Sequence, residues 1–113
     1  MHTIIETPTF RSRVKDVGIS EGELQELILY IAENPMAGMA MSGTGGARKL
    51  RWAGKGKGKS GGFRVITFFS GMDIPVFLLD IYTKNEKDNL TKAEQNQLKS
   101  ILQNLAAAYR RIQ

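Results

Sequence analysis

Three runs of strand-forming residues follow one another in the middle of the chain, and this order constrains the fold more than any other feature. Residues 47–53 alternate between apolar and basic side chains, as a half-buried strand does. Residues 63–69 and 76–82 are rich in aromatic and β-branched side chains, which favour central strands. The intervening Ser-Gly-Met-Asp at 70–73 has turn chemistry. We therefore expect the last two runs to form a hairpin.

Helical patterns flank these three runs. Ser20 with Glu23, and Thr91 with Glu94, each form a capping box at the start of an apolar stripe with helical spacing. The two stripes comprise Leu24, Leu27, Ile28 and Ile31, and Leu98, Ile101, Leu102, Leu105 and Tyr109. The first helix should end at Asn34, because the residue before a proline avoids the helical region.

The fold class follows from this order of elements. A short strand at 3–6 precedes the first helix, the three runs come next, and the second helix closes the chain. At 113 residues the chain has the usual length of one domain. We predict a single α+β domain over residues 1–113, in which helices pack against an antiparallel sheet of about four strands.

The charge is segregated along the chain. The net charge is +5, but no acidic residue occurs between Glu33 and Asp73. That stretch carries seven cations: Arg48, Lys49, Arg51, Lys55, Lys57, Lys59 and Arg64. The rest of the chain has a net charge of −2. Because solvated surfaces usually mix both signs, this segregation indicates a face that binds a polyanion such as a nucleic acid.

Residues 54–62 form a loop in which glycine and lysine alternate. Its glycine–lysine–serine sequence and glycine spacing superficially match phosphate-binding loops. Those loops feed phosphate onto the start of a helix, whereas this one runs into a predicted strand, so we reject both matches. Crowded lysines repel one another, which lowers their pKa values and favours a neutral amine that can act as a general base. We assign that role and phosphate binding to Lys55, Lys57 and Lys59.

Arg64 follows the loop and lies on the predicted strand. A strand holds a side chain more firmly than a loop does, and a guanidinium can clamp phosphate with two hydrogen bonds. We predict that it stabilises the transition state. Arg48, Lys49, Arg51 and Lys84 are expected to hold RNA, with Tyr82 stacking on a base.

Several functional classes are excluded or disfavoured by composition. The chain has no cysteine, which rules out disulfides, thiolate zinc sites and a cysteine nucleophile. Its one histidine, His2, cannot supply a paired-histidine mechanism. The N-terminus does not resemble a signal peptide, and no apolar run approaches the ~20 residues of a membrane helix. We expect a cytoplasmic protein that needs no metal or other cofactor.

Two blocks of sequence together resemble the RelE/HigB family of bacterial type II toxins. The first runs from Gly43-Thr44-Gly45-Gly46-Ala47-Arg48-Lys49-Leu50-Arg51 through the glycine–lysine loop to Gly61-Gly62-Phe63-Arg64-Val65-Ile66. The second comprises Leu79-Asp80-Ile81-Tyr82-Thr83-Lys84-Asn85-Glu86 and Leu90-Thr91. The resemblance covers residues 20–105, is specific only when both blocks are combined, and is strongest to the HigB-like branch.

The resemblance implies a microbial-ribonuclease-like sheet and an enzyme that cuts messenger RNA in the ribosomal A site. It also implies a cognate antitoxin, often of helix-turn-helix type. Operator DNA would be bound only by this antitoxin and not by the toxin itself. The family's catalytic arginine corresponds to Arg64. Its other cations correspond either to Lys49 and Arg51 or to the loop lysines. The chain departs from many members in having Lys84 and Asn85 where they have an arginine, and Leu90 and Thr91 near their tyrosine.

Two other functions compete with the nuclease. A ParE-like gyrase inhibitor would share the architecture, although the dense lysine loop argues against it. A non-enzymatic module that binds RNA or the ribosome would show strong salt dependence and leave the messenger intact.

Overall fold

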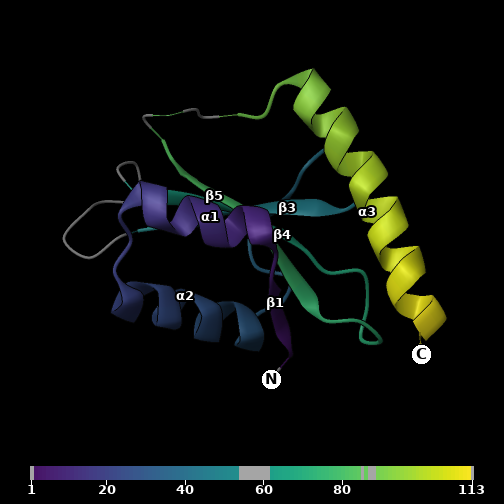
Figure 1. Cartoon of the computed structure of the whole chain (residues 1–113), viewed down its shortest axis with the longest axis horizontal. Helices are drawn as coiled ribbons and strands as arrows, with labels where there is room; N and C mark the ends of the chain where they lie inside the picture. The colour runs from purple at the N-terminus through teal and green to yellow at the C-terminus, as the bar shows by residue number, and fades with distance from the viewer. Residues whose placement is uncertain (1, 54–61, 85, 87–88, 113) are drawn as a thin grey trace.

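The computed structural model describes residues 2–53, 62–84, 86 and 89–112, and within them the chain forms an α+β fold (Figure 1). The strands are β1 (Ile4–Glu6), β2 (Met39–Ala40), β3 (Ala47–Trp52), β4 (Phe63–Phe68) and β5 (Val76–Thr83). The helices are α1 (Pro8–Val17), α2 (Glu21–Glu33) and α3 (Lys92–Ile112). The strands make one sheet in the order β1-β5-β4-β3-β2.

The centre of the sheet confirms the predicted meander. β3, β4 and β5 are antiparallel neighbours, with Leu50 opposite Val65 and Val65 opposite Ile81. The sheet differs from the prediction at both edges. β1 runs parallel to β5, with Ile4 opposite Val76, and the short β2 lies beside β3. The sheet is therefore mixed and has five strands in the described residues, because the long connection after β1 allows a parallel arrangement.

Both predicted capping boxes are present. The Ser20 Oγ accepts a hydrogen bond from the Glu23 backbone N–H at 3.2 Å, and the Thr91 Oγ1 accepts one from Glu94 at 3.1 Å. These bonds satisfy backbone donors that have no partner within the first helical turn. α2 ends at Asn34, as predicted.

α1 was not expected from the sequence. Its N-cap is Thr7, whose Oγ1 accepts a hydrogen bond from the Phe10 N–H at 3.3 Å. Pro8 occupies the first helical position, where its missing N–H costs nothing. The helix ends at Gly18, whose φ of 75° is the left-handed conformation that glycine adopts readily. α1 packs against β5.

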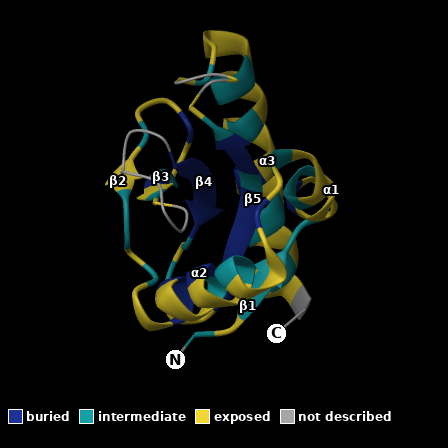
Figure 2. Ribbon diagram, turned by 90° about the vertical axis from the view of Figure 1, so that its left-hand side faces the viewer, coloured by how far each residue is buried: buried dark blue, intermediate teal, exposed yellow. Residues whose placement is uncertain are grey.

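The hydrophobic core lies on both faces of the sheet, as the buried strands in Figure 2 show. α1 and α2 cover one face, where Phe10 and Leu27 pack with Val65. α3 covers the other, which we call the α3 face, where Leu102 packs with Ile66, Phe68, Phe77 and Tyr82. All six residues of β4 are buried because this strand lies between two layers of helices.

The base of the β3–β4 hairpin requires a close backbone approach. Trp52 and Phe63 are paired at the ends of the two strands, and Gly62 lies directly before Phe63. A Cβ atom at Gly62 would lie 2.3 Å from the Trp52 carbonyl oxygen, which is a severe clash. Glycine at this position therefore allows the two strands to meet where Arg51 and Arg64 are paired.

Candidate nucleic-acid-binding site

A row of three predicted site residues crosses the central strands. Arg51 on β3 is opposite Arg64 on β4, and Arg64 is opposite Tyr82 on β5. Side chains alternate along a strand, so Arg64 lies on the same face as Ile66, which packs in the α3-face cluster with Tyr82. Cross-strand partners lie ~5 Å apart at their Cβ atoms. The sheet therefore brings Arg51, Arg64 and Tyr82 together on the α3 face.

Arg64 is buried at the centre of this row, with only 1% of its surface exposed. Desolvating a guanidinium costs free energy that is recovered only through close polar or charged neighbours. A small domain has only a small free energy of folding, so a costly buried arginine in its central strand is not expected for stability alone. Its presence there indicates a functional role. The fixed strand position is the one that the sequence analysis expected for this residue.

Tyr82 is fully buried and belongs to the hydrophobic cluster under α3. Base stacking, its predicted role, requires an accessible face of the ring. In the structure the ring is instead enclosed in that cluster, and the residue lies opposite Arg64 on the neighbouring strand.

We call the cations Lys49, Arg51 and Arg64 the cationic row, of which Lys49 and Arg51 belong to β3. They lie two residues apart and therefore on the same face of the strand. The Lys49 Nζ donates a hydrogen bond to the Asn89 Oδ1 at 3.1 Å, and Arg51 is exposed. Both line an open groove of about 640 Å³, whose wall also includes Asn89, Gln95 and residues 38–42. The groove places two cations beside a surface that could receive an extended chain.

Two of the other predicted contacts lie elsewhere. Arg48 lies on the opposite face of β3 from Lys49, and its Nη2 donates to the Gly38 carbonyl at 2.9 Å. This bond ties β3 to the segment before β2. Lys84 is exposed and follows the last residue of β5, two positions after Tyr82.

The predicted catalytic lysines Lys55, Lys57 and Lys59 lie outside the described residues. In the sequence they fall between Trp52 and Phe63, which are paired at the ends of β3 and β4.

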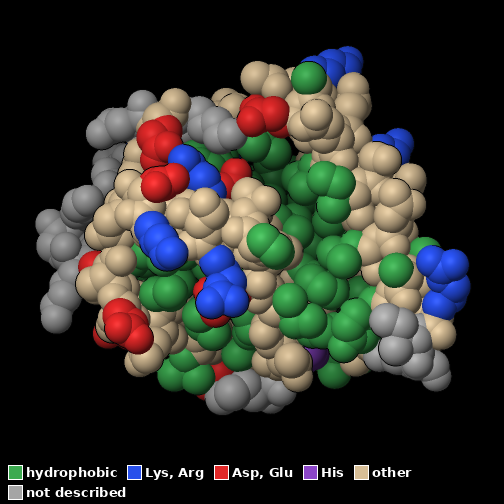
Figure 3. Space-filling model, in the orientation of Figure 1, with side chains coloured by type: hydrophobic (Ala, Val, Ile, Leu, Met, Phe, Trp, Pro, Cys, Tyr) green, Lys and Arg blue, Asp and Glu red, His purple; other side chains and the backbone are tan. Residues whose placement is uncertain are grey.

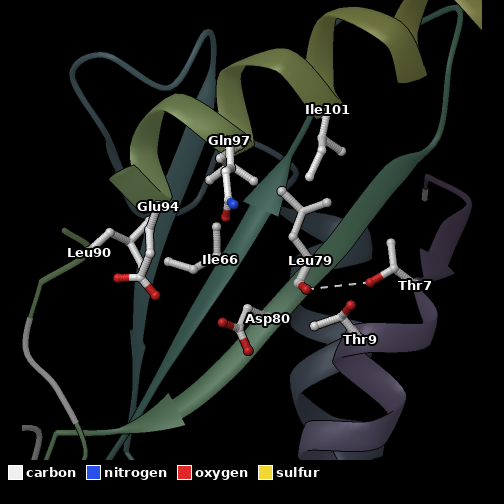
Figure 4. A pocket seen from close by; sticks show the side chains of 10 residues that line it. Thr7, Thr9, Ile66, Leu79, Asp80, Leu90, Glu94, Gln97 and Ile101 are labelled. Carbon is white, nitrogen blue, oxygen red and sulfur yellow. Dashed lines mark hydrogen bonds between the residues drawn. The ribbon is translucent and has the colours of Figure 1, made fainter. Parts of the chain in front are cut away.

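A second hollow lies beside the row, between the start of α1 and α3. Figure 3 shows hydrophobic side chains gathered there, and Figure 4 shows the cavity of about 260 Å³ from close by. Ile66 and Leu79 contribute apolar surface, while Asp80 and Glu94 contribute carboxylates. The described residues that line the hollow include no cation, so its chemistry differs from that of the groove at Lys49 and Arg51.

The described residues contain no group of three or more metal-ligating side chains placed to hold an ion. Among the helices described, none has the length and apolar character needed to cross a bilayer.

A comparison with protein families places these features in a known context. The family model described as the RelE toxin of the RelE/RelB toxin–antitoxin system matches residues 2–111. The match includes all five described strands, α1, α2, α3 up to its penultimate residue, and all residues of the cationic row. On this evidence the chain belongs to the RelE toxin family.

Proposed function

We propose that this toxin is an endoribonuclease that cleaves messenger RNA in the A site of the translating ribosome. The observation that carries the proposal is the row of Arg51, Arg64 and Tyr82 across the central strands, in a chain of the RelE toxin family. A rigid sheet that fixes a guanidinium supplies preorganised positive charge, which is the main requirement for stabilising a phosphoryl transition state.

The proposed reaction uses the RNA's own 2′-hydroxyl as nucleophile. A base removes its proton, the 2′-oxygen attacks the adjacent phosphorus, and the bond from phosphorus to the 5′-oxygen breaks. The leaving oxygen takes up a proton, so the products are a 2′,3′-cyclic phosphate and a 5′-hydroxyl. We assign stabilisation of the phosphorane charge to Arg64, whose buried guanidinium would have to be uncovered when RNA binds. The base and phosphate contacts are assigned to Lys55, Lys57 and Lys59.

The remaining predicted contacts divide by position. Lys49 and Arg51 lie in the open groove and would neutralise backbone phosphates on either side of the scissile bond. Lys84 would bind RNA from the end of β5. The ribosome completes the site by presenting the message in an extended form, so free RNA would be a poor substrate.

The biological setting follows from membership of a toxin–antitoxin family. We propose that the chain acts in the cytoplasm as one toxin domain and arrests translation. A cognate antitoxin, of helix-turn-helix type, neutralises it and carries operator binding for the pair. This type of partner is what the resemblance to the RelE/HigB family implies.

Expression of the toxin in growing cells, followed by mapping of new RNA ends, tests the proposal. We expect cuts confined to translated regions. At each cut the upstream fragment should end in a 2′,3′-cyclic phosphate, and the downstream fragment should begin with a 5′-hydroxyl. The same message with its start codon removed should stay intact. Double-strand DNA breaks without messenger loss would instead indicate a gyrase inhibitor, and growth arrest with intact RNA and DNA would leave only a binding role.

A further inference from the structure

An arginine on α1 contacts two acidic residues, one within β5 and one beyond its end. The Arg13 Nη2 donates a hydrogen bond to the Glu86 Oε2, beyond the end of the strand. The Arg13 Nε lies 3.6 Å from the Asp80 Oδ1, within the strand. Tyr82 and Lys84 lie between these two attachment points in the chain. Neither Arg13 nor Glu86 has a role in the proposed chemistry.

Glu86 in turn closes the bend that contains Lys84. Its backbone N–H donates to the Thr83 carbonyl at 3.1 Å. Its Oε1 accepts hydrogen bonds from the Thr83 backbone N–H and from the Thr83 Oγ1, each at 3.2 Å. One carboxylate oxygen therefore fixes the bend, while the other oxygen is bound by Arg13.

Electrostatics support this arrangement. The hydrogen bond from Arg13 is the main reason why the pKa of Glu86 lies below its ordinary value, with the Thr83 N–H as the next cause. The same bond raises the pKa of Arg13. Both groups thus stay charged across the physiological range. The Arg13 side chain is only 29% exposed, so α1 limits the positions that the guanidinium can adopt.

We propose that Arg13 is a positioning residue, which holds Lys84 in register for RNA through Glu86 and the end of β5. This inference rests on the proposed function, because it assumes that Lys84 contacts RNA. α1 would then do more than cover the core, since it would also hold the residues that follow β5 in position.

Binding to programmed ribosomes, measured as Kd, tests the proposal. Arg13→Gln and Glu86→Gln should each weaken binding several-fold, and the double variant should be no weaker than either alone, because both changes break the same contact. Arg13→Lys should restore part of the affinity. Arg11→Gln is the matched control, since it removes one exposed positive charge from the same helix and should leave Kd near the wild-type value.

The decisive comparison uses Lys84→Gln as background. If Arg13 acts through Lys84, Arg13→Gln should have almost no further effect on Kd there. An equal loss of affinity from Arg13→Gln in the wild-type and Lys84→Gln backgrounds would overturn the proposal. The same holds if Arg13→Gln binds ribosomes as tightly as Arg11→Gln. Thermal unfolding of each variant identifies any loss of fold, and Glu86→Gln provides a second route to the same contact if Arg13→Gln is unstable.

The two proposals fail in different ways. Wild-type protein that binds ribosomes without cutting messages would refute the nuclease, while the cycle between Arg13 and Lys84 could still show positioning through its effect on Kd. Wild-type protein that cuts messages, together with an additive cycle, would keep the nuclease and remove Arg13 from the site.

Discussion

Arg64 on β4 and Tyr82 on β5 are direct cross-strand partners, and both are excluded from solvent, at 1% and 0% exposure. Two buried side chains at directly opposite positions leave each other few rotamers. The pair thus links the hydrophobic cluster under α3 to the cationic row. The stability of the cluster and the geometry of the proposed site should depend on each other.

The burial of Tyr82 predicts that its ring contributes mainly by packing. Tyr82→Ala should lower the free energy of unfolding by about 3–5 kcal/mol, as for other large aromatic truncations in a core. Tyr82→Phe, which keeps the ring, should cost less than about 2 kcal/mol. Urea unfolding measures both. Similar, small losses in the two variants would show that the ring is not packed as described.

Adjacent positions on α3 should respond very differently to truncation. Leu102 is 1% exposed and Ile101 is 54% exposed, although the sequence pattern placed both in one apolar stripe. Leu102→Ala should cost about 2–5 kcal/mol of unfolding free energy, because it leaves a cavity against the sheet. Ile101→Ala should cost well under about 1 kcal/mol. Equal costs in denaturant unfolding would contradict the way α3 lies on the sheet.

Arg110 near the end of α3 binds the turn between β4 and β5. Its Nε donates to the Asp73 Oδ2 at 2.6 Å, and its Nη2 donates to the Ser70 Oγ at 3.0 Å. The hydrogen bond from Arg110 is the main reason why the pKa of Asp73 lies below its ordinary value. Because the pKa of this carboxyl is lower in the folded state, its ionised form stabilises the fold at pH values above the ordinary pKa of ~3.9. That stabilisation is lost as the pH falls through the lowered pKa.

Arg110→Gln should therefore raise the pKa of Asp73, observed by NMR titration of its carboxyl carbon. It should also reduce stability at neutral pH but not at a pH where Asp73 is protonated in both proteins. Arg111→Gln serves as the neighbouring control and should leave the titration of Asp73 in place. A titration unchanged by Arg110→Gln would remove the contact from the account.

Arg51 should contribute to RNA binding through its charge. If its guanidinium neutralises one phosphate, Arg51→Gln should reduce the slope of log affinity against log salt by about one. Ribosome or RNA binding at several salt concentrations measures this slope. Arg11→Gln again matches the loss of one exposed charge and should leave the slope unchanged. Equal slopes for all three proteins would show that Arg51 does not face the nucleic acid.

Local signals in the sequence were sufficient for much of the fold. The capping boxes at Ser20 and Thr91 located the starts of α2 and α3, because they encode hydrogen bonds within one turn. The aromatic and β-branched runs located β4 and β5, because these side-chain types favour strands over a few consecutive residues. α1 was missed although Thr7 and Pro8 are good start signals, because it is mostly polar and buries only Phe10.

Non-local features could not be obtained in the same way. The parallel pairing of Ile4 with Val76 joins residues far apart in the chain, and a three-residue strand has no pattern that specifies its partner. The same limit applies to the site. Arg64 was proposed as a site residue from its expected strand position, whereas the contact between Arg13 and Glu86 depends on how α1 meets the end of β5.

Cleavage of a defined message on translating ribosomes by wild-type protein and by Arg64→Lys tests the central claim most directly. The lysine keeps a positive charge at a buried position but loses the guanidinium's paired donors. The account predicts that the single-turnover cleavage rate falls by about 10²–10³-fold, as when one transition-state donor is removed. Ribosome binding and the unfolding transition should be largely retained. Equal cleavage rates for the two proteins would contradict the assignment of Arg64 and with it the proposed site.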